Sequence, residues 1–191
     1  MNNNINLAVD CMGSETSLIE ILEGINESAL RNENLFFTLF GKSIDINQTI
    51  ENISPLNTRS KVINCDDQIL MTDKPTDAIK SKKKSSMQLS IDHVSSGESQ
   101  AALSCGNTGA LMAISLLKLR TIASIKRPSI ASIWPNIKGE SIVLDLGANI
   151  KNDATSLIDN AILGSALAKV LLNMVEPSIG LLNVGIEEMK G

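Results

Sequence analysis

The amino-acid sequence predicts an α/β protein whose fold is a three-layer α/β/α sandwich around a mostly parallel sheet. Strand-like apolar segments alternate with segments whose apolar residues recur at helical spacing. The strand-like segments are apolar throughout, as expected for strands that helices cover on both faces. With 191 residues, of which 43% are hydrophobic and 20% charged, the chain can bury one sizeable core. We therefore expect a single α/β domain over residues 1–191.

The first half of the chain predicts three strands and two helices. Leu18, Leu22 and Ile25 recur at helical spacing. Residues 35–40, in contrast, form an unbroken apolar run typical of a buried strand. In chain order we expect a strand at residues 5–9, a helix at 18–30, a strand at 35–40, a weaker helix at 44–53 and a strand at 61–64.

The second half continues the alternation after a polar, loop-like stretch at residues 66–73. Met87, Ile91 and Val94 fall on one face of a helix. In chain order we expect a helix that starts at residues 75–79, a helix at 87–94, a strand at 101–104, a helix at 108–119, strands at 129–133 and 142–146, a helix at 155–172 and a strand at 179–183. We expect these strands to extend the same parallel sheet.

Composition and charge exclude several kinds of partner and site. A formal net charge of -4 and a pI near 5.1 argue against non-specific nucleic-acid binding, which needs a basic surface. Aromatic residues, at 2%, are too few for stacking on bases. Three cysteines without a Cys-x-x-Cys pair and a single histidine support neither a disulfide framework nor a zinc site. We therefore expect no metal and a reducing, cytoplasmic location.

The N-terminus predicts a protein that is not exported. It lacks the basic and long apolar regions of a secretory signal. No unbroken apolar run approaches the roughly 18 residues that span a bilayer. We therefore expect no integral membrane segment, while peripheral contact with a membrane stays open.

Four of the expected strands end in short polar or glycine-containing loops. These loops are Asp10-Cys11-Met12-Gly13 and residues 104–109, 145–149 and 183–191. Because ligands of parallel α/β sheets sit at the carboxyl ends of the strands, we expect the four loops to line one crevice. For each loop by itself a simple turn is the favoured explanation, and the four loops together favour a site.

The motif Ser104-Cys105-Gly106-Asn107-Thr108-Gly109 joins an expected strand to an expected helix. A turn of this kind aims unpaired backbone N–H groups, and the positive end of the helix dipole, at whatever it holds. The motif therefore predicts an anion site.

The dense positive run Lys80-Ser81-Lys82-Lys83-Lys84-Ser85-Ser86 has two interpretations of about equal weight. It is either a solvated surface or a phosphate site, in which the serines cap the next helix beside ammonium groups. For His93 we expect a structural or surface role, since no nucleophile lies near it in sequence. We expect Cys105 to be a small buried residue and not a nucleophile.

Six ordered segments resemble the PlsX-type phosphate acyltransferases of bacterial phospholipid synthesis. They cover essentially the whole chain and are Leu7-Ala8-Val9-Asp10-Cys11-Met12-Gly13, Ile69-Leu70-Met71-Thr72-Asp73-Lys74-Pro75, Lys82-Lys83-Lys84-Ser85-Ser86-Met87, Ser104-Cys105-Gly106-Asn107-Thr108-Gly109-Ala110-Leu111-Met112, Leu144-Asp145-Leu146-Gly147-Ala148-Asn149, and Gly180-Leu181-Leu182-Asn183-Val184-Gly185-Ile186-Glu187-Glu188-Met189-Lys190-Gly191. The resemblance implies a catalytic domain with a fold similar to the phosphate acyltransferase/isocitrate dehydrogenase-like fold.

The resemblance also implies an activity and its partners. A fatty acyl group passes from acyl-acyl carrier protein to inorganic phosphate, and the acyl phosphate product serves phospholipid synthesis. The same resemblance implies no cofactor, a homodimer and a cytoplasmic protein with possible peripheral membrane contact. Phosphate is already nucleophilic near neutral pH and a thioester has a good leaving group, so the protein needs mainly to orient the reactants and screen charge.

Roles for individual residues follow from the resemblance. Phosphate and substrate binding fall to Asp10, Gly13, Lys82, Lys83, Ser85, Ser86, Gly106, Asn107, Thr108 and Gly109. Asn149, Asn183 and Lys190 are expected around the reacting carbonyl as catalytic residues.

The chain departs from the family pattern at three places. Ser14-Glu15-Thr16 stands where the family usually has a second glycine, an acidic residue and a proline, and Cys105 stands where it usually has alanine. Family members continue well beyond Lys190-Gly191, so we expect a domain truncated at its C-terminus.

Two alternatives to the acyl carrier protein reaction stay open. One is a non-catalytic remnant that binds phosphate or a partner, and the other is a coenzyme A-dependent phosphate acetyl- or butyryltransferase. A nicotinamide-dependent dehydrogenase is poorly supported, because no Gly-x-Gly-x-x-Gly follows the first strand.

Overall fold

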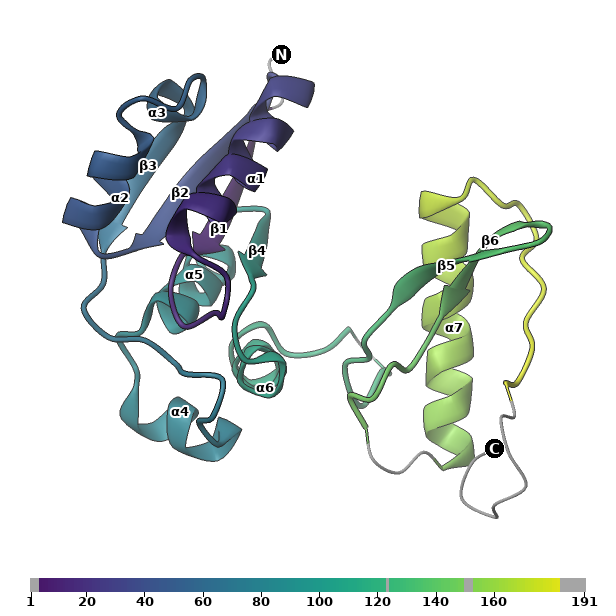
Figure 1. Ribbon diagram of the computed structural model, residues 1–191. Coiled ribbons are helices and arrows are strands. Elements are labelled where there is room, and N and C mark those ends of the chain that lie inside the picture. Colours follow the sequence, from purple (N-terminus) through teal and green to yellow (C-terminus); the bar gives the residue numbers. More distant parts are fainter. Residues whose placement is uncertain (1–3, 123, 150–152, 183–191) are drawn as a thin grey trace. The chain divides into compact units, whose positions relative to one another are not determined.

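The computed structural model describes residues 4–122, 124–149 and 153–182. The chain divides into two compact units, Met1–Arg120 and Thr121–Gly191. The first unit holds a parallel sheet with helices, and the second holds a β-hairpin and one long helix (Figure 1). The single catalytic domain expected over residues 1–191 stays a prediction.

Four parallel strands form the sheet of the first unit. They are β1 (Ile5–Asp10), β2 (Leu35–Gly41), β3 (Ser60–Asn64) and β4 (Ala101–Ser104), and they lie in the order β3-β2-β1-β4. The chain moves outward from β1 to β3 and then returns past β1 to β4, so the strand order reverses between β1 and β4. Asp10 at the end of β1 lies opposite both Phe40 and Ser104. A reversal of this kind is where open α/β sheets place their ligands.

Helices cover both faces of this sheet, which confirms the predicted three-layer α/β/α fold. α1 (Leu18–Arg31), α2 (Ser43–Ile50) and α3 (Leu56–Arg59) pack on one face, and α5 (Ser86–Ser95) packs on the other. Successive strand residues point to opposite faces. Leu39 accordingly packs with the first group, and its neighbour Phe40 packs with residues of α5.

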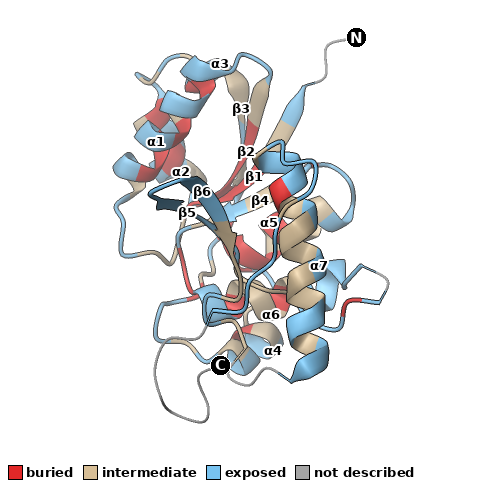
Figure 2. Cartoon of the chain, turned by 90° about the vertical axis from the view of Figure 1, so that its right-hand side faces the viewer, coloured by how far each residue is buried: buried red, intermediate tan, exposed pale blue. Residues whose placement is uncertain are grey.

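Two more helices extend the layer that α5 forms. α4 (Pro75–Ser81) and α6 (Thr108–Leu119) pack with α5 around Ala78, Ile91 and Ile114. Buried residues concentrate in the strands and on the helix surfaces that meet them (Figure 2).

α1 shows how the sequence sets an element. Ser17 Oγ accepts a hydrogen bond from Glu20 N (3.4 Å), and Glu20 Oε2 accepts one from Ser17 N (2.9 Å). This capping box satisfies N–H groups that the first turn would leave unpaired. Leu22 and Ile25 then lie on the buried side of the helix. The helix predicted at residues 18–30 is confirmed.

The other elements expected in the first unit are confirmed to within a few residues. The strand at residues 101–104 and the helix at 108–119 have the predicted bounds. The helix expected at residues 44–53 ends earlier, at Ile50. The short helix α3 follows Pro55, between the helix and the strand expected at residues 44–53 and 61–64.

The second unit contains an antiparallel hairpin instead of further parallel strands. β5 (Ser132–Asn136) pairs with β6 (Gly139–Val143), and two residues join them. The parallel strands expected at residues 129–133 and 142–146 are therefore wrong in position and direction. A parallel pair needs a crossover of a dozen or more residues, and the connection here is far too short for one.

The third strand expected in this part of the chain is not formed either. Residues 179–182 have no regular secondary structure. Asn183, the last residue of that expected strand, lies outside the described residues.

α7 (Ala154–Leu171) confirms the helix predicted at residues 155–172 and packs against β6. Only 6% of this 18-residue helix is buried, and its mean hydropathy of 1.2 makes it long and apolar enough to cross a bilayer by length and composition. The expectation that no unbroken apolar run reaches that length agrees with α7, since Asp159 and Asn160 interrupt its apolar residues, and the absence of an integral membrane segment stays a prediction. Length and composition alone do not assign the helix to a membrane.

We expect Leu22→Ala to destabilise the first unit by about 2–5 kcal/mol, because it opens a cavity between α1 and the sheet. Urea unfolding followed by far-UV circular dichroism measures the change. Leu30→Ala is the matched control, since Leu30 lies on the same helix but is 61% exposed. Its cost should stay below about 0.5 kcal/mol. Equal losses in the two variants would contradict this assignment of the core.

Candidate functional site

The buried carboxylate of Asp10 joins the loop after β1 to the loop after β4. Ser104 Oγ donates a hydrogen bond to Asp10 Oδ2 (2.7 Å), and Met12 N donates one to Asp10 Oδ1 (3.2 Å). Gly106 N in turn donates to Ser104 Oγ (3.0 Å). Asp10 is 2% exposed. One carboxylate therefore fixes both loops at the point where the strand order reverses.

Burial raises the pKa of Asp10 above its ordinary value of 3.8, and the Ser86 and Ser104 hydroxyls and the Met12 N–H oppose the rise. Ser86 Oγ is close enough to act on this carboxyl group, yet it forms no hydrogen bond of normal geometry with a described residue. The buried polar cluster thus has spare hydrogen-bonding capacity beside Asp10.

The loop after β1 packs so closely on the segment before α4 that glycine is required. Gly13 has φ +72°, and a Cβ there would lie 2.0 Å from the carbonyl oxygen of Ile69. A Cβ at Gly106 would lie 3.2 Å from both Met87 Cε and Ser104 Oγ. Gly13 and Gly106 therefore act through close backbone packing.

Asn107 uses its whole side chain to join α6 to the segment before α4. Its Oδ1 accepts a hydrogen bond from Ala110 N (2.9 Å) and so caps the helix. Its Nδ2 donates to the carbonyl oxygens of Leu70 (3.2 Å), Met71 (3.0 Å) and Asp73 (2.9 Å). In this arrangement the Asn107 side chain holds protein groups, and its predicted contact with phosphate stays a prediction.

Lys82 holds the same segment from the opposite end. Its Nζ donates to the carbonyl oxygen of Gln68 (2.8 Å) and forms an ion pair with Asp73. The hydrogen bond from Lys82 lowers the pKa of Asp73, and the Leu70 N–H contributes in the same direction. Lys82 therefore holds residues 68–73 in place, and its predicted contact with phosphate stays a prediction.

The start of α6 is the part of the glycine-containing turn that stays open. Thr108 and Gly109 are exposed, and neither backbone N–H donates to a described residue. Together with the Thr108 hydroxyl, they face solvent at the positive end of a 12-residue helix. Cys105 beside them is exposed, so the expectation that it is buried is wrong.

The two serines of the lysine-serine segment are buried, in contrast to its lysines. Ser85 caps α5 by accepting from Gln88 N (3.4 Å), and Ser86 N donates to the carbonyl oxygen of Asp67 (3.1 Å). Lys83 and Lys84 are exposed and line a pocket of about 480 Å³. The segment is thus divided between structural serines and solvent-facing lysines.

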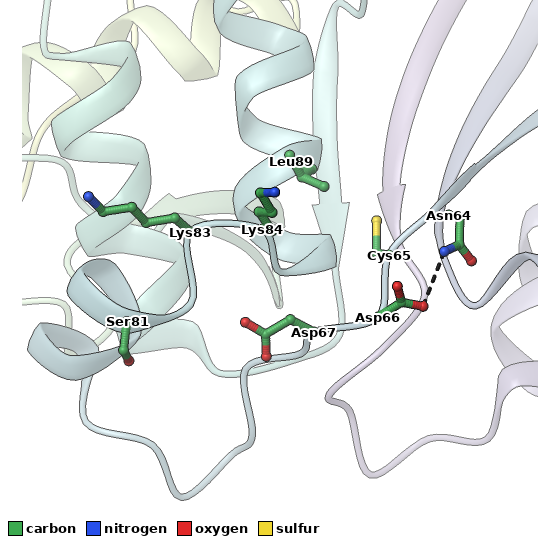
Figure 3. Close-up of a pocket in the computed structure, with 8 residues that line it drawn as sticks. All are labelled: Asn64, Cys65, Asp66, Asp67, Ser81, Lys83, Lys84 and Leu89. Atoms are coloured by element: carbon green, nitrogen blue, oxygen red, sulfur yellow. Dashed lines mark hydrogen bonds between the residues drawn. The ribbon is translucent and has the colours of Figure 1, made fainter.

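Two pockets lie at the carboxyl ends of the strands, and sequence reasoning did not single out their acidic residues. Asp66 and Asp67, directly after β3, line the 480 Å³ pocket with the two lysines (Figure 3). Lys42 and Asp45, after β2, line a pocket of about 240 Å³ that also borders Gly13. These acidic residues could have been predicted in the same way as the other loops, because polar residues there directly follow a strand.

The glycine-containing loop of the second unit is organised around Asp145. Its Oδ1 accepts from Ile130 N (2.9 Å) and Ala148 N (3.1 Å). Its Oδ2 accepts from Asn149 N (2.8 Å) and Asn149 Nδ2 (2.9 Å). Asn149 Nδ2 also donates to the carbonyl oxygen of Pro128 (3.2 Å). Asn149 therefore helps to fold this loop, while Asn183 and Lys190 lie outside the described residues.

The remaining reactive side chains of the first unit have structural surroundings. Burial raises the pKa of Cys11 to about 12 and that of Cys65 to about 11, so both are thiols at neutral pH. His93 Nδ1 pairs with Ser99 Oγ (2.8 Å), and its ring packs edge-on against Phe40. This environment agrees with the structural role expected for His93.

Comparisons with known proteins point to one family. The family model described as a fatty acid synthesis protein matches residues 5–191. Similar curated proteins include phosphate acyltransferases from Azorhizobium caulinodans, 44% identical over 98% of this chain and 53% of the relative, and from Afipia carboxidovorans, 43% identical over 100% and 54%. A phosphate acyltransferase from Rhodopseudomonas palustris is 44% identical over a region that covers 100% of this chain and 54% of the relative. The chain spans about half the length of these relatives.

We expect Asn107→Ala to destabilise the first unit by more than the loss of a helix cap, which costs about 0.5–2 kcal/mol. The variant also removes the Nδ2 hydrogen bonds to three carbonyl oxygens, of which only that of Leu70 keeps another described backbone donor, Asp73 N. Asn107→Ser keeps a cap but loses the Nδ2 donors, so its stability in urea unfolding should fall between wild type and Asn107→Ala. Equal stability of the serine and wild-type proteins would contradict the role given to Nδ2.

We expect Asp10→Asn to gain stability relative to wild type as the pH rises above 3.8. The folded chain binds the Asp10 proton more tightly than the unfolded chain does, so wild type loses stability between 3.8 and the raised pKa and then levels off. Urea unfolding of both proteins from about pH 4 to 8 measures this difference. A difference that is constant over the range would show that burial does not raise the pKa of Asp10.

Proposed function

We propose that this chain, which belongs to the fatty acid synthesis protein family, transfers a fatty acyl group from acyl-acyl carrier protein to inorganic phosphate. The curated relatives are named phosphate acyltransferases, and that name supports phosphate as the acceptor. The acyl carrier protein as donor rests on the family resemblance of the six sequence segments. The product, an acyl phosphate, would serve phospholipid synthesis.

The observation that carries the proposal is the open start of α6. Thr108 and Gly109 present two backbone N–H groups without partners among the described residues, beside the Thr108 hydroxyl. A phosphate ion needs several donors and a positive potential, and the N-terminus of a helix supplies both. The Asn107 cap and the Lys82–Asp73 ion pair would position this turn without touching the phosphate.

The proposed chemistry asks little of acid or base catalysis. A phosphate oxygen attacks the thioester carbonyl carbon and forms the new C–O bond. The C–S bond then breaks, and the thiolate of the carrier leaves and takes up a proton from solvent. The site would contribute by desolvating and aligning the phosphate and by stabilising charge on the carbonyl oxygen.

The residues around the thioester carbonyl are proposed from the sequence resemblance alone. We assign them as Asn149, Asn183 and Lys190, of which only Asn149 lies among the described residues. Asn149 Nδ2 donates to Asp145 and Pro128, so a direct contact with substrate would require it to give up one of these bonds. A cytoplasmic homodimer with peripheral membrane contact likewise stays a prediction.

Incubation of the chain with acyl-acyl carrier protein and phosphate tests the proposal. Phosphorus-31 NMR measures the acyl phosphate, and thiol titration measures the released carrier. We expect both products in equal amounts and none without phosphate. Phosphate binding without turnover would favour the non-catalytic alternative, and a preference for acetyl- or butyryl-coenzyme A would favour the short-chain transferase.

We expect Thr108→Val to lower acyl phosphate formation by about 10- to 100-fold, because it removes a hydrogen bond to a charged group worth about 1.5–3 kcal/mol. Thr155→Val is the matched control, since Thr155 is an exposed threonine near the start of α7. Wild-type rates in Thr108→Val, with unchanged far-UV circular dichroism, would remove Thr108 from the site.

A further inference from the structure

We propose that the pocket beyond the carboxyl end of β3 binds a phosphate ester whose carbon skeleton carries hydroxyl groups. The pocket has a volume of about 480 Å³, which is within the range of small-molecule sites. It lies at the same edge of the sheet as the Asp10 cluster, since its lining begins at Asn64, the last residue of β3.

Charges of both signs line this pocket without pairing to each other. Lys83 and Lys84 precede α5, Asp66 and Asp67 follow β3, and the two pairs lie on different sides of the pocket (Figure 3). Neither lysine forms an ion pair with a described residue. The neighbouring Lys82 does find an aspartate, so proximity in sequence does not prevent pairing here.

The aspartates have unused acceptor capacity. Among described residues, Asp66 accepts only from Asn64 Nδ2 (3.1 Å), and Asp67 accepts through its side chain only from its neighbour Gln68 N (2.9 Å). An ionised carboxylate has about four lone-pair sites, so each could accept further hydrogen bonds from a ligand.

The pocket walls are fixed to each other by backbone contacts. Asp67 and Ser85 form an isolated parallel bridge, and Ser86 N donates to the carbonyl oxygen of Asp67 (3.1 Å). The lysine segment and the aspartate segment are therefore held in place before any ligand enters. A preformed site loses less conformational entropy on binding.

The arrangement of charges selects the ligand chemistry. Two ammonium groups favour a phosphate, while two carboxylates repel it and favour hydroxyl donors. A bare phosphate would satisfy one side only. A molecule with a phosphate at one end and hydroxyl groups at the other satisfies both sides. Cys65 also lines the pocket, and burial raises its pKa to about 11, so it is a thiol at neutral pH.

Isothermal titration of the whole chain with defined probes tests this proposal. The probes are sn-glycerol 3-phosphate, 4′-phosphopantetheine, inorganic phosphate and glycerol. We expect at least one ester to bind at least fivefold more tightly than inorganic phosphate, and glycerol not to bind. Tighter binding of glycerol phosphate would indicate that the ligand is a free metabolite. Tighter binding of phosphopantetheine would indicate that the ligand is the prosthetic arm of a carrier. Equal affinity for esters and inorganic phosphate, or no binding of either ester, would overturn the proposal.

Substitutions locate the binding. Lys83→Ala and Lys84→Ala should weaken the bound ester at least fivefold, and the exposed Lys80→Ala on α4 should not. Asp66→Asn with Asp67→Asn should weaken the ester while leaving inorganic phosphate unchanged. Thr108→Val should leave ester affinity unchanged, so this result is independent of acyl phosphate formation. An ester affinity that responds to Thr108 and not to Lys83 and Lys84 would contradict the proposed pocket.

Discussion

The hydrogen bond from Ser104 Oγ to the buried carboxylate of Asp10 is the contact on which the site depends. It joins β1 to β4 at their carboxyl ends, where the strand order reverses. Met12 N and, through Ser104, Gly106 N are tied to the same carboxylate. Burial makes the charged form of this group costly, and its hydrogen bonds offset part of that cost. One side chain therefore positions both the loop after β1 and the loop after β4 that leads to the proposed phosphate.

The polar residues of the motifs divide into two groups with different work. Asn107 and Lys82 donate hydrogen bonds to residues 68–73 and so hold this segment in place at the carboxyl edge of the sheet. Thr108, Lys83 and Lys84 are exposed, and their side chains form no hydrogen bond or ion pair with the part of the chain that the structure describes. The residue types alone do not show this division, since an asparagine or lysine in such a motif suits either task. What decides it is a segment more than 30 residues away in sequence from Asn107.

The sequence predicts the first unit well because its elements are set locally. Apolar periodicity and the capping box of Ser17 define α1, and continuous apolar runs define β2. The sequence does not predict the hairpin of β5 and β6, because Pro135 is unusual within a strand and the apolar runs are short and flanked by polar residues. The antiparallel direction follows only from the two-residue connection between the strands. The same limit applies to the site. The glycines of the sequence predict the turn that starts α6. The hydrogen bonds of Asn107 and the ion pair of Lys82 are tertiary contacts, which no local sequence pattern predicts.

Phosphate titration of the isotope-labelled chain, followed by amide chemical shifts, tests whether the start of α6 holds the attacking phosphate through the N–H groups that have no partner among the described residues. We predict saturable shifts at Thr108 and Gly109, and any shifts at the residues of the β3 pocket should follow a separate titration curve. An absence of shifts at these two amides, with saturation at other residues, would contradict this role of α6.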